Sequence, residues 1–193
     1  MNLFKWYLIP GIQLIAARFS LPERKKLKSK EIHLLQQKLK ERILQDENLI
    51  PLLRHDENGK PYLTDGRKIS ISHSENKVLI ALSDAIEIGV DIQYPRKKTT
   101  QIIQRITSPE EWEIPMEQGI YNTAHFIWCA KEAVYKAHGI KGLSLRNNVR
   151  LLFANGIPVI AKVYGENPAI YRLYPAMWDE SYIVLAVRDV LKE

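Results

Sequence analysis

The sequence of 193 residues predicts an α+β fold made of two similar α/β halves, residues 1–94 and 95–193. Two helix-start signals combine a serine, a proline and an acid, at residues 20–23 and 108–111. Each signal is followed by a longer amphipathic pattern and then by strand-like runs, an order typical of α+β proteins. A proline and a basic run follow Tyr94, and we place the boundary between the halves there.

In the first half, the apolar and aromatic run at residues 3–9 predicts a strand that ends at Pro10-Gly11. Apolar residues recur at three- and four-residue steps from Ser29 to Gln45, which predicts a long helix. Asn58-Gly59-Lys60-Pro61 is typical of a turn. Further strands are expected at residues 69–72, 78–82 and 87–92.

In the second half, a helix is expected at residues 99–106, followed by a capped helix start at Ser108. A longer helix is predicted from Asn122 to His138, because Gly139 is a typical helix terminator. The segment 154–156, Ala-Asn-Gly, indicates a hairpin turn. Four strands are expected, at residues 149–153, 159–164, 170–174 and 182–187.

The composition indicates a globular protein of the cytoplasm. Hydrophobic residues make up 46% of the chain and charged residues 26%, as in ordinary globular domains. No apolar run approaches the roughly 20 residues that span a membrane, and the first ten residues do not resemble a signal peptide. The single cysteine, Cys129, excludes an internal disulfide framework and fits a reducing compartment.

The net charge of +6 indicates an acidic partner without naming it. Nucleic acid, a phosphate-rich cofactor and an acidic protein surface are all compatible with it. The two basic clusters, residues 24–28 and 96–98, are not interleaved with aromatic residues, as a stacking platform for nucleic acid would require. We therefore expect no nucleic acid among the partners.

The stretch 128–136, Trp-Cys-Ala-Lys-Glu-Ala-Val-Tyr-Lys, carries the strongest chemical signal. Glu132 lies between Lys131 and Lys136 on the predicted helix, and Asp91 ends a predicted strand about forty residues earlier. Two carboxylates with cations beside them can hold Mg²⁺ on a pyrophosphate. Alone, however, the helix also fits a solvated face with an ordinary ion pair between Glu132 and Lys136.

Two other constellations are weaker. His125 and Cys129 are spaced as zinc ligands on a helix, but no second Cys-His pair is available to complete a tetrahedral site. Ser72 and His73 lie in a serine-rich strand end that fits either a polar turn or a phosphate contact. A hydrolase is not indicated, because no glycine-flanked nucleophile elbow is present. Asp91 by itself can simply cap a turn.

Together these blocks resemble the 4′-phosphopantetheinyl transferases, in their longer, pseudo-two-fold, monomeric class of the surfactin-synthetase-activating type. The most specific match is a Gly-x-Asp strand end followed about forty residues later by Trp-x-x-Lys-Glu-x-x-x-Lys. The resemblance covers residues 59–145 in the family's order. It rests on the segments 59–61, 70–74, 88–92, 108–111, 128–136 and 141–145.

The resemblance implies Mg²⁺-dependent transfer of the 4′-phosphopantetheine arm of coenzyme A to a serine of an apo acyl or peptidyl carrier protein. Adenosine 3′,5′-bisphosphate would be released. It also implies a monomer with the active site between the two halves. By resemblance, Asp91 and Glu132 are the metal ligands and Glu132 also takes the serine proton. Lys136 contacts the pyrophosphate, with Lys131 beside it. The expected contacts to the adenosine end are Lys60, Ser72, His73 and Arg24.

Two positions depart from the family pattern. Many members of the longer class have an acid two residues after the aspartate, where this chain has Gln93, a weaker metal ligand. The nearest equivalent of an arginine found in the first long helix of many relatives is Lys38. An alternative is therefore a protein that binds coenzyme A on the same fold but is catalytically weak.

Overall fold

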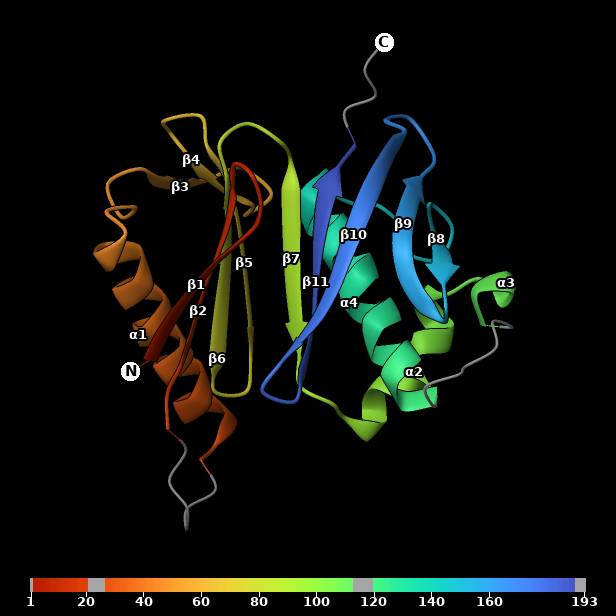
Figure 1. Ribbon diagram of the computed structural model, residues 1–193, viewed down its shortest axis with the longest axis horizontal. Coiled ribbons are helices and arrows are strands. Elements are labelled where there is room, and N and C mark those ends of the chain that lie inside the picture. Colours follow the sequence, from red (N-terminus) through yellow and green to blue (C-terminus); the bar gives the residue numbers. More distant parts are fainter. Residues whose placement is uncertain (1, 21–26, 113–119, 190–193) are drawn as a thin grey trace. The chain divides into compact units, whose positions relative to one another are not determined.

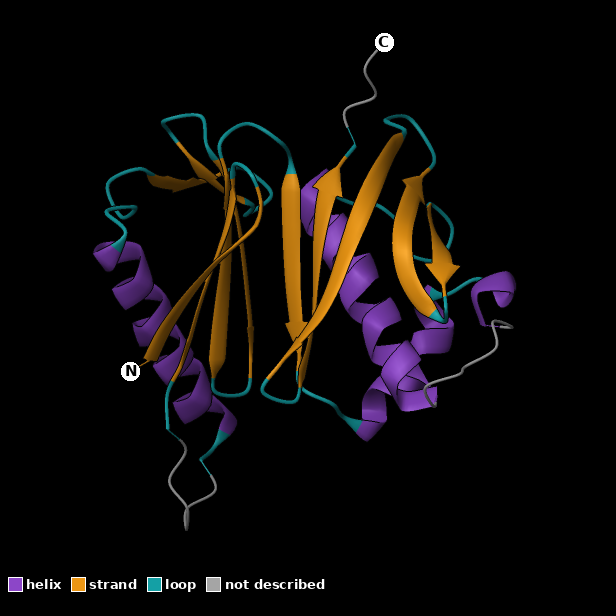
Figure 2. Cartoon of the chain, in the orientation of Figure 1, coloured by secondary structure: helices purple, strands orange, loops and turns teal. Residues whose placement is uncertain are grey.

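The computed structural model describes residues 2–20, 27–112 and 120–189, and these residues form helices and antiparallel sheets (Figures 1 and 2). The chain divides into two compact units, Met1–Ala85 and Ile86–Glu193. Each unit combines its own sheet with at least one long helix. The protein is therefore a mixed α/β protein, as the sequence predicts.

The first unit contains a four-stranded antiparallel sheet in the order β1-β2-β6-β5 (Figure 1). Helix α1 (Ser29–Asp46) lies against one face of this sheet and buries Leu39 and Ile43 there. The sheet side of the same core includes Ile15, Ile69 and Ile80. The strands are β1 (Asn2–Ile9), β2 (Ile12–Arg18), β5 (Lys68–Ser74) and β6 (Lys77–Ser83).

The predicted long helix is confirmed, and β1, β5 and β6 were also expected. Strand β2 was not predicted, because Gln13 is its only polar residue before Arg18 and the run lacks a two-residue alternation. It follows β1 directly, since Gly11 takes the positive φ of +77° that the tight turn needs. Of the first predicted helix start, residues 21–23 lie outside the described residues.

A short two-stranded sheet, also not predicted, joins α1 to β5. It pairs β3 (Leu53–His55) with β4 (Pro61–Leu63), and β4 lies against β5. The predicted turn at 58–61 connects them, and its Gly59 has a φ of +80°. The carboxylate of Asp56 accepts the backbone N–H groups of Asn58 and Lys60, which holds the turn closed.

The second unit contains a five-stranded antiparallel sheet in the order β7-β11-β10-β9-β8. Helix α4 (Ile120–His138) packs along this sheet, and α2 (Lys97–Ile106) packs against α4 (Figure 1). A further short helix is α3 (Pro109–Trp112). The strands are β7 (Ile88–Gln93), β8 (Val149–Ala154), β9 (Ile157–Val163), β10 (Ala169–Trp178) and β11 (Ser181–Arg188).

The local signals of the second half are confirmed. Asn155 and Gly156 both have positive φ, 50° and 71°, as a tight hairpin between β8 and β9 requires. Gly139 follows α4 with a φ of +72° and donates its N–H to the carbonyl of Tyr135. The core under α4 consists of small and branched residues, including Ala130, Ala133 and Val134.

The division into units falls at residues 85 and 86, whereas the sequence suggested a boundary at Tyr94-Pro95. The physical reason is the pairing of β7. Its residues Ile88–Gln93 form a ladder with β11, so this strand is the edge of the second sheet. A strand belongs to the unit that satisfies its backbone hydrogen bonds. Pro95 follows β7 but does not alter the pairing of β7 with β11.

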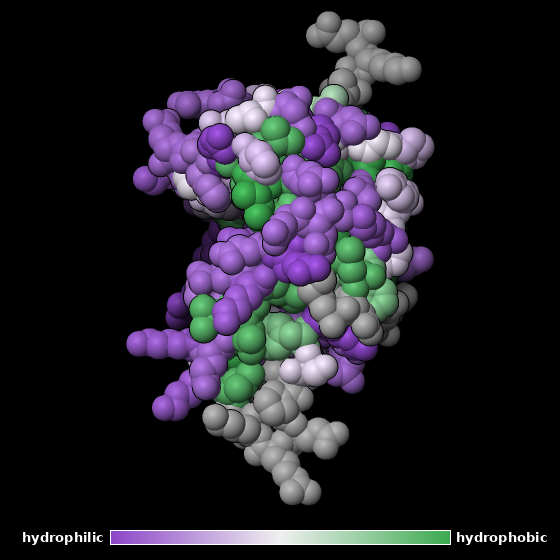
Figure 3. Space-filling view, turned by 90° about the vertical axis from the view of Figure 1, so that its left-hand side faces the viewer, coloured by the Kyte–Doolittle hydropathy of each residue, from purple (hydrophilic) through white to green (hydrophobic). Residues whose placement is uncertain are grey.

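The side of the first unit that carries α1 is mainly hydrophilic (Figure 3). Helix α1 exposes Lys38 and Arg42, and Arg42 is paired with Asp46 one turn later. In the part of the chain that the structure describes, no helix combines the length and the apolar character needed to cross a bilayer.

Candidate functional site

The candidate site in the second unit is a pair of carboxylates and a lysine held between β7 and α4. Asp91 is 6% exposed in β7, and Lys136 lies two residues before the end of α4. The Lys136 Nζ donates to Asp91 Oδ1 at 2.7 Å and to the Val90 carbonyl at 3.1 Å. This contact joins residues that are 45 positions apart in the chain.

Glu132 lies one helical turn before Lys136 and is half-buried. Burial raises its pKa above the usual carboxyl range, and the negative charge of Asp91 raises it further, while Lys136 opposes the shift. The charge of Asp91 is therefore near enough to disfavour ionisation of Glu132. A proton, a lysine or a divalent cation can relieve this repulsion.

The chemistry of these donors fits Mg²⁺. Carboxylate oxygens are the ligands that Mg²⁺ prefers, and one or two of them suffice when substrate phosphates and water complete the octahedron. Among the described residues, no group of three or more His, Cys, Asp or Glu side chains is arranged to hold a metal by itself. Asp91 and Glu132 can thus hold Mg²⁺ only together with ligands from outside the chain.

Gln93 lies on the same side of β7 as Asp91, because side chains alternate along a strand. Its side-chain amide donates to the carbonyl of Tyr94 at 3.2 Å. The amide oxygen is a neutral metal-ligand atom, so Gln93 can add a ligand to this edge of the site without adding charge.

Lys131 does not lie with this cluster. Its side chain is fully buried, and its Nζ pairs with Glu111 at 2.7 Å and donates to the carbonyls of Leu145 and Val149 at 2.8 Å each. This differs from the cofactor contact expected from the sequence. The reason is geometric, since successive residues of a helix are rotated by about 100°, so Lys131 points away from the direction of Glu132.

Glu111 was recognised only as the third residue of a capped helix start. That capping box is confirmed: Ser108 N donates to Glu111 Oε2 at 2.9 Å and Glu111 N donates to Ser108 Oγ at 3.4 Å. Glu111 Oε1 also accepts the N–H of Leu151, at 2.7 Å. Glu111 and Lys131 therefore tie α3, α4 and β8 together. Nothing in the spacing of the sequence indicated that they form a buried pair.

The remaining predicted residues lie in the first unit. Lys60 is half-buried in the turn before β4, and β5 carries Ser72, which is buried, and His73, which is exposed. The His73 ring meets the ring of His33 on α1 edge to face, with centroids 6.1 Å apart. His33 was not predicted, although it lies in the helix that follows the basic cluster. Arg24 lies outside the described residues.

His125 and Cys129, which share a stripe with Glu132 on α4, are fully buried. The solvated helix face that the sequence also allowed is therefore wrong for this stripe. His125 Nε2 accepts the backbone N–H of Arg96 at 3.0 Å, and Cys129 Sγ donates to the carbonyl of Tyr182 at 3.6 Å. Burial, with a smaller effect of Asp91, raises the pKa of the Cys129 thiol well above its usual range. Cys129 is a packing residue of the core under α4.

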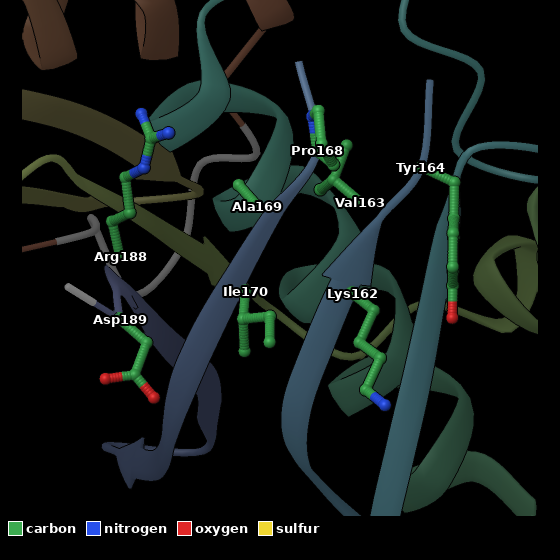
Figure 4. A pocket seen from close by; sticks show the side chains of 8 residues that line it. All are labelled: Lys162, Val163, Tyr164, Pro168, Ala169, Ile170, Arg188 and Asp189. Carbon is green, nitrogen blue, oxygen red and sulfur yellow. The ribbon is translucent and has the colours of Figure 1, made fainter. Parts of the chain in front are cut away.

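A hollow of about 710 Å³ lies at the ends of β9, β10 and β11 in the second unit (Figure 4). Lys162, Arg188 and Asp189 surround it, and Asp189 is paired with Arg172 at 3.2 Å. None of the predicted site residues that the structure describes lines this hollow. It is therefore separate from the carboxylate cluster.

The buried pair leads to a first prediction. Replacing Lys131 with Met should lower the free energy of unfolding by about 3–5 kcal/mol, because Glu111 is left as an uncompensated buried charge. Urea denaturation followed by circular dichroism measures the change. Lys98, exposed on α2, provides the control, and Lys98→Met should change stability little. Equal stability of the two variants would contradict the structural role of Lys131.

A second prediction concerns Glu132 in metal-free protein. Its raised pKa means that the folded state holds the proton more tightly than the unfolded state, so ionisation costs stability as pH rises above the usual carboxyl range. Glu132→Gln should therefore raise the melting temperature at neutral pH, and the gain should disappear at acidic pH. Thermal denaturation with a chelator, across pH, measures it.

Glu110 is the matched control for that experiment. Its pKa is lowered, chiefly by the hydrogen bond with Ser108, and it is fully exposed. Glu110→Gln should therefore give no gain at neutral pH and at most a small loss. A Glu132→Gln variant that is no more stable than wild type at neutral pH would show that ionised Glu132 does not strain the fold.

Comparison with known proteins finds one family. Residues 87–178 match the family model described as the 4′-phosphopantetheinyl transferase superfamily. A 4′-phosphopantetheinyl transferase of Bacillus subtilis is 34% identical over 134 residues, which cover 65% of this chain and 58% of that protein. The transferase AcpT of Salmonella typhimurium is 33% identical over 97 residues, 47% of this chain and 50% of that protein.

The transferase HetI of Nostoc sp. is 32% identical over 96 residues, which cover 44% of this chain and 40% of that protein. The chain spans about half the length of the curated relatives that it matches. The segment matched by the family model contains Asp91, Glu132 and Lys136, the residues that the structure brings together. Through residues 87–178 the chain is therefore similar to the 4′-phosphopantetheinyl transferase superfamily.

Proposed function

We propose that the protein transfers the 4′-phosphopantetheine arm of coenzyme A to a serine of an apo acyl or peptidyl carrier protein. The reaction requires Mg²⁺ and releases adenosine 3′,5′-bisphosphate. The observation that carries the proposal is the contact of Lys136 with Asp91 beside the half-buried Glu132, within the segment that matches the family. The net charge of +6 suits both an acidic carrier protein and the phosphates of coenzyme A.

Asp91 and Glu132 are the proposed ligands of Mg²⁺, with Gln93 as a weak third. Mg²⁺ would supply positive charge for the pyrophosphate oxygens, where negative charge builds as the phosphorus–oxygen bond to the adenosine bisphosphate breaks. Lys136 adds a second positive charge. Its side chain is 27% exposed. The ammonium group can therefore release the Asp91 carboxylate and bind a phosphate oxygen without a rearrangement of the core.

Glu132 is also the proposed base for the serine proton. The serine oxygen forms the new bond to the β-phosphorus, and its proton passes to Glu132 directly or through a water. The raised pKa of Glu132 favours this role, because a base works best when its pKa lies nearer the working pH than that of an ordinary carboxylate. Lys131 has no part in binding, since Glu111 and two carbonyls engage it.

The adenosine end of coenzyme A is assigned to the first unit, through Lys60, Ser72, His73 and Arg24. We also propose the pseudo-two-fold, monomeric arrangement of the longer class for the halves 1–94 and 95–193. In support, each unit has an antiparallel sheet with a long helix on one face. A cytoplasmic location fits the single buried cysteine.

The proposal predicts arm transfer that depends on both carboxylates. Incubation with coenzyme A, Mg²⁺ and an apo carrier protein should add the arm, as measured by the intact mass of the carrier. Asp91→Asn and Glu132→Gln should each lower the rate by about 10²-fold or more, because each removes a charge that binds the metal. Glu110→Gln is the exposed control and should keep the wild-type rate.

Near-normal transfer by either carboxylate variant would contradict the assignment. If no carrier gains the arm while coenzyme A still binds, the protein is instead a catalytically weak coenzyme A-binding protein. The neutral Gln93 on the Asp91 side of β7 is the feature that favours this alternative.

The role of Gln93 can be measured separately. Gln93→Glu adds a negative charge next to Asp91 on the same face of β7, so the Mg²⁺ concentration for half-maximal transfer should fall. Titration of the transfer rate with Mg²⁺ provides the measurement. An unchanged Mg²⁺ requirement would show that residue 93 is not part of the metal site.

A further inference from the structure

Strand β7 and helix α4 touch through their backbones at Gly89. A Cβ atom on Gly89 would lie 1.9 Å from the carbonyl oxygen of Ala133 and 2.5 Å from the backbone nitrogen of Ala137. Carbon atoms in contact normally lie about 3.5–4.0 Å apart. Any other residue at this position must therefore push the strand and the helix apart, since backbone atoms of a helix cannot rotate away.

The position of this contact links it to the candidate site. Asp91 lies two residues after Gly89 and therefore on the same side of β7. On α4, Glu132 and Lys136 immediately precede Ala133 and Ala137, the two residues that Gly89 touches. The backbone contact is thus next to both halves of the carboxylate cluster.

The measured contacts agree with a close approach. Lys136 Nζ reaches past the side of the strand to the carbonyl of Val90, at 3.1 Å, while holding Asp91 at 2.7 Å. Glu132 lies one helical turn before Lys136 on the same helix, so its position follows that of α4. A wider gap between β7 and α4 would lengthen all of these contacts together.

We propose that Gly89 is a positioning residue that sets the separation of Asp91 and Glu132 and thereby fits the site to a small divalent cation. The inference rests on the proposed function, in which these carboxylates hold Mg²⁺. Mg²⁺ requires oxygen ligands at about 2.0–2.1 Å in near-ideal octahedral geometry, whereas Ca²⁺ accepts about 2.3–2.6 Å and irregular geometry. A widened site should therefore lose Mg²⁺ more than Ca²⁺.

The alternative is that Gly89 serves packing alone. In that case a larger residue would lower stability but would leave the relative affinities for the two ions unchanged. Val163 provides the matched control, because it is buried in the same core under α4, on β9, and is not part of the candidate site. Val163→Ala removes volume from this core without inserting an atom between β7 and α4.

The experiment compares wild type, Gly89→Ala and Val163→Ala, each bound to coenzyme A, by calorimetric titration with Mg²⁺ and with Ca²⁺. Gly89→Ala should bind Mg²⁺ at least about tenfold more weakly, the size expected when a supporting residue of a metal site is lost. Its ratio of Mg²⁺ to Ca²⁺ affinity should fall, while Val163→Ala keeps the wild-type ratio. An unchanged ratio in Gly89→Ala would overturn the proposal.

Ala137→Val widens the same contact from the helix side and serves if Gly89→Ala does not fold. Ala137 is 1% exposed, so two added methyl groups must press α4 away from the sheet. The same fall in the Mg²⁺ to Ca²⁺ ratio is expected, and its absence would again overturn the proposal. Failure of the wild-type protein to bind either ion would instead contradict the proposed metal site itself, which separates the two outcomes.

Discussion

The close packing of β7 on α4 is the interaction on which the candidate site depends. It brings Asp91 to Lys136 across 45 positions of the chain and places Glu132 beside them. The absence of a side chain at Gly89 allows the two backbones to touch, and small residues of α4, Ala133 and Ala137, meet it. Because interiors are close-packed, such a contact fixes the distance between neighbouring polar groups more firmly than loops could.

Helix α4 combines anchored and accessible polar residues. Lys131 and His125 are fully buried and bonded to α3, β8 and the start of α2, which fixes the position and rotation of the helix. Glu132 and Lys136 are half-buried, so both side chains remain accessible. Partial burial also reduces the screening of their charges by water. The anchoring costs desolvation, which lowers the pKa of Lys131 despite the charge of Glu111.

Helices and turns that depend on local sequence patterns were predicted correctly. Periodicity and terminators located α1 and α4 to within two residues, and Asn155-Gly156 located a hairpin, because these signals act through local backbone geometry. Strand β2 was not predicted because its sequence is nearly all apolar. The boundary between the units was placed after β7, whereas the pairing of β7 with β11 makes β7 part of the second unit. Such features depend on partners far away in the chain, which local patterns do not specify.

The sequence by itself indicated the family resemblance and the members of the candidate cluster, because both depend on the residue types and spacing of Asp91, Glu132 and Lys136. Only the tertiary structure decided which of these charges are buried and which stay accessible. Lys131 and Glu132 are adjacent in sequence, yet one is neutralised in the core and the other stays half-exposed. Burial and ion pairing arise from contacts between distant segments, and the helix rotation that separates these two side chains is set by what α4 packs against.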